Sequence, residues 1–223
     1  MRTTRVAGLF GMVMLAAGVA AAQDTGSAAV LFVHVHVLDR AAIAPRDWTL
    51  AATVVETIYR KAGLTTIWAH DLPGIAADPR TDVTVIAITG DASRAAATSF
   101  DVPTNALAFV PGAAGNHGRL VYVFEDRIAA LSSKSGIAYS ALLGRVLAHE
   151  IGHVLLPFNS HSRTGIMRAA LDSRSMHLEF FTDAQAAIIR ARLAERTSMP
   201  GPQSAVGVCD NRERSQGTVD SAR

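Results

Sequence analysis

The sequence predicts a single α/β domain, of the α+β kind, in which a twisted, mixed sheet packs against helices. Short runs rich in β-branched residues alternate with amphipathic helical patterns, as in residues 29–38, 48–61 and 65–68. Of the 223 residues, 49% are hydrophobic and 18% are charged, which is typical of a globular chain with a buried core. The sequence contains no internal repeat that would indicate an array of small units.

The first 22 residues have the pattern of a secretory signal peptide. Arg2 and Arg5 precede an apolar run from Val6 to Val19, which ends in three alanines before a polar residue. The run is short and rich in Gly and Ala for a membrane span. We therefore expect cleavage after Ala22 and a secreted or periplasmic protein without a membrane anchor.

The basic charge of the sequence lies in this leader. The chain has 21 basic and 19 acidic residues, a formal net charge of +2, and residues 1–22 contain two arginines and no acid. The remaining formal charge of zero offers little to attract nucleic acid or an anionic membrane. The one cysteine, Cys209, excludes a disulfide within the chain.

Further elements are predicted from periodicity and from helix-stop residues. A helix from Trp48 to Lys61, with Asp47 as N-cap, is expected to bury Leu50, Val54 and Ile58. The predicted strands are 29–38, Thr65–Trp68, Val83–Ile88, Ala106–Val110 and Leu120–Phe124. A long helix from Ile137 to Leu155 is ended by Pro157, a loop covers 157–175, and a last helix runs from Thr182 or Asp183 to Glu195. From Ser198 the composition predicts a disordered tail, so the folded domain spans residues 23–197.

The stretch His149-Glu150-Ile151-Gly152-His153 carries the chemistry. Residues four apart on a helix lie one above the other, so both imidazoles can face one metal ion. Neutral imidazole is a good zinc ligand. Glu150 lies beside that face, where it can take a proton from zinc-activated water without binding the metal.

The flanking residues favour a metal site over a surface helix that happens to carry two histidines. They are all uncharged, so the helix should be buried nearly all round: Leu147, Ala148, Ile151, Gly152, Val154, Leu155 and Leu156. Polar groups buried without partners cost about 2–7 kcal/mol each. A zinc ion supplies such partners.

A catalytic zinc ion needs a third protein ligand and an open fourth position. His161 is the favoured candidate because it lies in the loop that must return to the metal after Pro157. Asn159 can adopt the left-handed conformation that turns the chain back under the helix, and Met167 follows in a tight apolar turn. The alternatives for the third ligand are Asp172, His177 and Glu179; a downstream Glu on a second helix would make the site gluzincin-like.

With these residues the chain resembles the metzincin metallopeptidases, of the matrixin or archaemetzincin type. The resemblance rests on the His149–His153 motif, a third His followed by Ser162, and Met167 in a turn. Upstream, residues 107–112, a glycine-rich loop and residues 120–126 look like the edge strand, bulge loop and next strand of matrixin catalytic domains. The recognisable motifs cover about residues 106–168, and the element order extends over 29–197. The usual metzincin spacing puts the third His at the position of Asn159; here it falls two residues later.

The resemblance implies a zinc peptidase acting on a peptide or protein, and we expect a monomer. His149, His153 and His161 would bind Zn²⁺, Glu150 would be the general base, and Met167 would be the Met-turn residue. The edge strand would pair with an extended substrate through its backbone: Ala106, Leu107, Ala108, Phe109 and Val110. Two alternatives stay open, namely hydrolysis of a small or cell-wall-derived amide, and a zinc-binding protein without turnover.

Other conspicuous side chains have simpler interpretations. His34 and His36 share one side of the first strand, and a half-exposed sheet face is expected there rather than a second metal site. Trp48 and Trp68 are predicted to be packing aromatics. His117, in the glycine-rich loop, is predicted to be a solvated turn residue.

Overall fold

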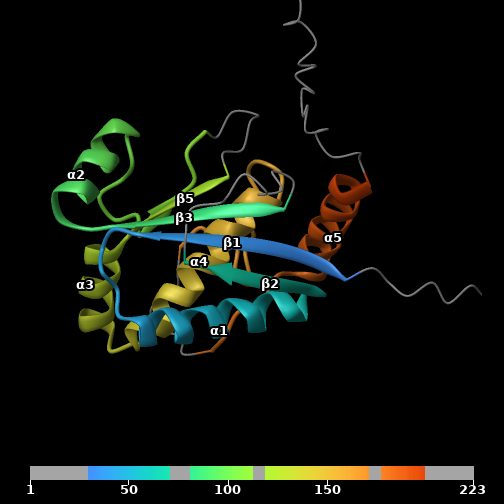
Figure 1. Ribbon diagram of the computed structural model, residues 1–223, viewed down its shortest axis with the longest axis horizontal. Helices are drawn as coiled ribbons and strands as arrows, with labels where there is room; N and C mark the ends of the chain where they lie inside the picture. Colours follow the sequence, from blue (N-terminus) through green and yellow to red (C-terminus); the bar gives the residue numbers. More distant parts are fainter. Residues whose placement is uncertain (1–29, 71–80, 113–118, 171–176, 199–223) are drawn as a thin grey trace, which may run out of the picture.

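The computed structural model describes residues 30–70, 81–112, 119–170 and 177–198 (Figure 1). Its elements follow the chain as strands and helices in one mixed α/β unit. They are β1 (Leu31–Asp39), α1 (Pro45–Lys61), β2 (Leu64–Ala69), β3 (Asp82–Ile88), α2 (Gly90–Ser99), β4 (Ala108–Phe109), β5 (Leu120–Phe124), α3 (Glu125–Ser135), α4 (Tyr139–Leu155) and α5 (Asp183–Ser198).

The strands form one five-stranded sheet with the order β2-β1-β3-β5-β4 among the described residues. Strands β2, β1, β3 and β5 run parallel, and β4 pairs antiparallel with β5 at one edge. The parallel connection from β1 through α1 to β2 is the crossover that such pairing needs. This is the mixed sheet that the sequence predicts.

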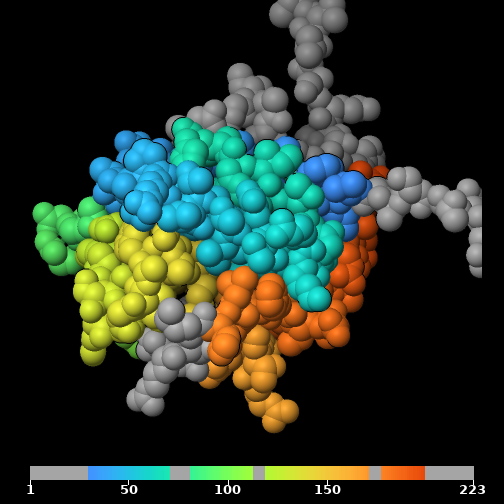
Figure 2. All heavy atoms as spheres, turned by 90° about the horizontal axis from the view of Figure 1, so that it is seen from below, coloured from blue at the N-terminus to red at the C-terminus, as the bar shows by residue number. Residues whose placement is uncertain are grey.

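Helices α1 and α4 cover one face of the sheet, and the core lies between them and the strands (Figure 1). On β1, Val33, Val35 and Val37 point into this core, and the alternate residues face the other side. Figure 2 shows the outer surface of the helical layer, where α1 lies beside α3, α4 and residues 177–198. Helix α4 is therefore enclosed on most sides, with 12 buried residues.

Helix α1 starts earlier than the sequence predicts and buries a different stripe. It begins at Pro45, whose fixed φ suits the first helical position, so Asp47 lies in the first turn and is not the N-cap. The predicted burial of Leu50 is wrong because that side chain is 43% exposed. Ile58 is buried and Val54 partly so. The packed side of α1 is made by Trp48, Ala51, Val55, Ile58 and Tyr59.

Two helices are additions to the prediction. Helix α2 buries Ser93 and α3 buries Ile128, so neither shows the apolar stripe by which helices are recognised. They are joined by side-chain hydrogen bonds, from Ser93 Oγ to Asp126 Oδ1 (2.9 Å) and from Thr89 Oγ1 to Glu125 Oε2 (3.1 Å). The edge strand β4 is shorter than the predicted strand 106–110.

Several predictions concern residues outside the described ranges: the signal peptide, His117, Asp172, Cys209 and the tail beyond Ser198. Ser198 itself ends α5. In the described part of the chain, no helix is long and apolar enough to cross a membrane. His34 and His36 lie on the half-exposed side of β1, as predicted, where both approach Asp82 Oδ atoms at 3.5 and 3.3 Å.

Candidate metal centre

Helix α4 holds two of the three predicted metal-ligating histidines. His149 and His153 lie one turn apart, and the tight packing of α4 against α1 fixes the helix that carries them. Tyr59 of α1 also donates from its hydroxyl to the Ala148 carbonyl at 3.1 Å, inside the core. The helix ends at Leu155, two residues before Pro157, as the sequence predicts.

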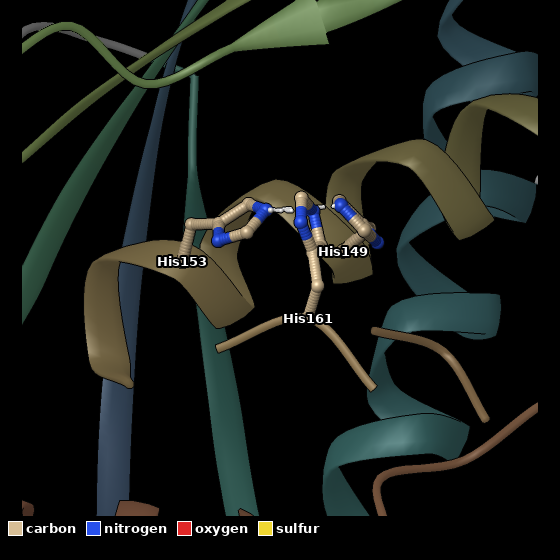
Figure 3. A group of neighbouring side chains, drawn as sticks. All are labelled: His149, His153 and His161. Atoms are coloured by element: carbon tan, nitrogen blue, oxygen red, sulfur yellow. Dashed lines mark hydrogen bonds between the residues drawn. The ribbon is translucent and has the colours of Figure 1, made fainter. Parts of the chain in front are cut away.

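The third histidine reaches the same point from the loop after α4, here called the return loop (residues 156–168). The Nε2 atom of His153 lies 3.0 Å from Nε2 of His149 and 3.1 Å from Nε2 of His161 (Figure 3). Among the described residues, these are the three side chains of metal-ligating type whose ligand atoms all lie within 4.8 Å of one another. Three nitrogens around one tetrahedral ion at about 2.0–2.1 Å would be about 3.3–3.4 Å apart. The three rings therefore converge closely enough to bind a metal ion.

Hydrogen bonds on the outer ring nitrogens support a metal-binding tautomer. The His149 Nδ1–H donates to the Ile166 carbonyl at 2.7 Å, which leaves the lone pair of Nε2 facing the other two histidines. On His153, Nδ1 lies 3.3 Å from Ser160 Oγ, so its Nε2 also points inward. A ring nitrogen that faces this point with its lone pair can bind a metal ion. The donor set thus fits a divalent metal of the zinc type.

The return loop turns under α4 through one left-handed residue. Asn159 has φ 60°, the conformation that the sequence predicts for it. Beyond His161, Ser162 N donates to the Met167 carbonyl at 2.8 Å, and Ile166 N donates to the Phe180 carbonyl at 2.9 Å. The loop is therefore tied to itself and to the segment before α5.

Met167 is fully buried against α4, in the turn that follows His161. Its Sδ atom contacts Gly152, where an added Cβ would lie 2.5 Å away. The neighbouring Ile166 supplies the carbonyl that orients His149. The turn at 165–167 is thus packed directly beneath the histidines.

Burial changes the proton affinity of two groups on α4. It lowers the pKa of the His149 imidazole, an effect that the hydrogen bond to Ile166 opposes and the nearby His161 reinforces. His149 is therefore neutral near pH 7, as a metal ligand must be. Burial also raises the pKa of the Glu150 carboxyl to about 8, which describes the metal-free protein because a bound cation favours the carboxylate.

The histidines open onto a cleft of about 1030 Å³. Exposure increases from His149 through His153 to His161, so the convergence point is reachable from the solvent. Glu150 lines the same cleft. The predicted substrate strand lines it too, with all of Ala106, Leu107, Ala108, Phe109 and Val110.

Edge strand β4 is held in place by an arginine. Arg127 Nη1 donates to the Ala106 carbonyl at 2.8 Å and to the Pro103 carbonyl at 3.0 Å, and its guanidinium stacks 4.0 Å from the centre of the Phe124 ring. Because β4 ends the sheet and pairs with β5 alone in the sheet order, no strand of the described residues lies beside its second edge. Such an edge can accept an extended peptide.

The alternatives for the third ligand lie elsewhere or outside the described residues. Glu179 is paired with the buried Arg145 (3.5 Å) and with Arg168 (3.6 Å). His177 is not in the cluster of ligand atoms around His149, and Asp172 is outside the described ranges. The structure brings together His149, His153 and His161.

Sequence reasoning missed the residues behind these histidines. Ser160 contacts His153, and Gln185 of α5 contacts the loop on both sides of His161. A signal for Gln185 exists, since Thr182-Asp183-Ala184-Gln185 has the spacing of a helix capping box. Its contact with the loop is visible only in three dimensions.

No protein-family model matches the chain, and no curated protein matches it in sequence.

Proposed function

We propose that this chain is an exported zinc metallopeptidase of the metzincin type. The single observation that carries the proposal is the convergence of three histidine Nε2 atoms in a cleft that also contains Glu150 and an edge strand. The arrangement of Met167 beneath the histidines adds support, because it is the packing that the metzincin resemblance implies. Three histidines leave a fourth coordination position for solvent or substrate.

His149, His153 and His161 would hold the ion. Zinc in such a site supplies Lewis acidity and lowers the pKa of water to about 7. Glu150, in the same cleft, would take the proton from the attacking water and pass it to the leaving amine. The substrate would lie extended along β4 and pair with it through backbone hydrogen bonds, which places a peptide bond beside the histidines.

The first part of the test is metal content and cleavage. Purified protein should contain one zinc ion per chain and cleave a mixed peptide library, and a chelator should abolish the cleavage. Glu150→Gln should bind zinc as the wild type does while cleavage falls by about 10²–10⁴-fold, the usual contribution of a general acid–base group. Glu56→Gln, an exposed change on α1, is the matched control and should leave the rate unchanged.

Equal cleavage by wild type and Glu150→Gln would contradict the role of Glu150. Stoichiometric zinc without turnover of peptides or small amides would instead identify a zinc-binding protein. If the protein cleaves small amides and leaves the peptides intact, it is the amide hydrolase of the alternative hypothesis. A protein without zinc affinity would contradict the proposal as a whole.

A further inference from the structure

Gln185 is a buried polar side chain on the packed side of α5. It is 8% exposed, and the side of α5 to which it belongs is otherwise apolar, with Ala186, Ile189 and Leu193. A buried amide is destabilising unless its donors and acceptor are all paired. The partners of Gln185 therefore indicate what it does.

The amide oxygen of Gln185 is used within its own helix. It accepts from Thr182 N at 3.1 Å, while Gln185 N donates to Thr182 Oγ1 at 3.3 Å. This reciprocal pair is a capping box, which stabilises the first turn of α5. It also fixes the orientation of the amide, because only the oxygen can accept from Thr182 N.

The amide nitrogen consequently points at the return loop. Gln185 Nε2 donates to the Ser160 carbonyl at 3.0 Å and to Ser162 Oγ at 3.2 Å, so both of its hydrogens are used. These two acceptors are the residues on either side of His161. Ser160 is in addition the residue whose Oγ lies 3.3 Å from His153 Nδ1.

We propose that Gln185 is a positioning residue for the metal centre: its amide clasps the return loop so that His161 faces His149 and His153. The proposal rests on metal binding by the three histidines, as in the proposed function. The connection from His153 to His161 is two residues longer than the usual metzincin spacing, which gives the proposal a physical basis. His149 and His153 are fixed by a packed helix, whereas His161 is exposed on a loop. That loop is held beside His161 by the backbone hydrogen bond from Ser162 to Met167 and by the Gln185 amide.

Loss of a group behind a metal ligand typically costs about 10–100-fold in metal affinity. Gln185→Glu tests this directly, because the carboxylate still accepts from Thr182 N but cannot donate to Ser160 or Ser162. Gln185→Leu removes both functions without adding charge. Thr182→Ala is the matched control, since it removes a capping oxygen and leaves the amide of Gln185 in place.

The full-length protein would be titrated with Zn²⁺ against a chromophoric chelator, and with Co²⁺ to record its visible absorption. Both Gln185 variants should bind Zn²⁺ about 10–100-fold more weakly than wild type and give an altered Co²⁺ spectrum. Thr182→Ala should lower the urea midpoint of the metal-free protein while affinity and spectrum stay as in wild type. Wild-type affinity and spectrum in both Gln185 variants would overturn the proposal.

Ser162→Ala keeps the test decisive if a Gln185 variant does not fold. The substitution removes the Ser162 hydroxyl, one of the two acceptors of the Gln185 amide, at a half-buried loop position. The zinc affinity of this variant should fall between those of wild type and Gln185→Leu. Unchanged affinity in Ser162→Ala, with Gln185→Leu and Gln185→Glu unfolded, would overturn the positioning role. A wild-type protein that binds neither Zn²⁺ nor Co²⁺ would overturn the proposed function itself, which distinguishes the two failures.

Discussion

Gly152 of α4 packs directly against Met167, so that a Cβ atom at Gly152 would lie 2.5 Å from the Met167 sulfur and 3.1 Å from Phe181 Cε1. Met167 is fully buried and Phe181 is 8% exposed, which leaves little room for either to move. Gly152→Ala should lower the free energy of unfolding by about 1–3 kcal/mol, as overpacking usually does. It should also weaken zinc binding, because a shift of Met167 displaces the Ile166 carbonyl from His149. Urea unfolding and zinc titration measure the two effects.

Gly144 provides the control for that variant. A Cβ there would lie 2.6 Å from Val54 Cβ and 2.7 Å from the Ala51 carbonyl oxygen, where α4 crosses α1. Gly144 lies about 140° around the helix from His149. Gly144→Ala should therefore destabilise the protein to a similar extent while the folded protein keeps its zinc affinity. Wild-type zinc affinity in Gly152→Ala would show that the Met167 turn does not orient the histidines.

His161 is expected to be the third ligand, and its removal should be more costly than the loss of an outer partner. His161→Ala should weaken zinc binding by more than about 100-fold, beyond the usual 10–100-fold effect of outer groups. His177→Ala is the matched control and should bind zinc as the wild type does. Weak zinc binding by His177→Ala, together with wild-type binding by His161→Ala, would identify His177 as the third ligand.

Glu179 should matter for stability and not for metal binding. It accepts from the buried Arg145, whose guanidinium Nη2 lies 3.5 Å from Glu179 Oε2. Glu179→Gln weakens this charged hydrogen bond, and the free energy of unfolding should fall by about 1–3 kcal/mol. Chemical denaturation measures the loss, and a parallel zinc titration should give the wild-type affinity. A large loss of zinc affinity would favour Glu179 as a ligand.

The partly buried Glu150 carboxyl predicts a pH dependence of the metal-free protein. Burial raises its pKa from 4.5 to about 8, so the folded chain binds this proton more tightly than the unfolded chain does. The stability that Glu150 contributes is therefore fully present below about pH 4.5 and is lost as the pH rises through about 8. Glu150→Gln stays neutral, so it should become more stable relative to wild type across this window.

Urea unfolding in the presence of a chelator, at several pH values between 5 and 8, measures that difference. His149 titrates in both proteins, so subtraction of one curve from the other isolates Glu150. Parallel curves for wild type and Glu150→Gln would contradict the raised pKa.

The sequence predicts those helices and strands in which burial imposes a regular spacing of apolar residues. Alternating valines at 33, 35 and 37 indicate β1, and the uncharged surroundings of His149 indicate an enclosed α4. Helices α2 and α3 were not predicted because each buries one residue and so lacks the apolar stripe that indicates a helix. The error at Leu50 has a similar cause, since the packed side of α1 includes small Ala51, which a ranking by hydrophobicity overlooks.

Those parts of the candidate site that depend on residues close together in the sequence could be predicted. The spacing of His149 and His153 follows from the helical repeat, and Asn159 tolerates the positive φ that returns the chain. The nearness of Gln185 to His161 depends on how α5 packs, which no local pattern specifies. Residues 106–110 line the cleft, but the part paired with β5 is limited to Ala108 and Phe109, and pairing of this strand with a substrate stays a prediction.

The hydrogen bonds from Gln185 of α5 to the return loop make metal binding depend on a part of the chain that is synthesised after the metal ligands. A polypeptide that has emerged only as far as residue 181 already contains all three histidines, Glu150 and Met167, yet lacks the amide that holds His161 in place. The last helix and the ion should consequently stabilise each other during folding. Added zinc is expected to slow amide hydrogen exchange in α5, although that helix supplies none of the three imidazoles.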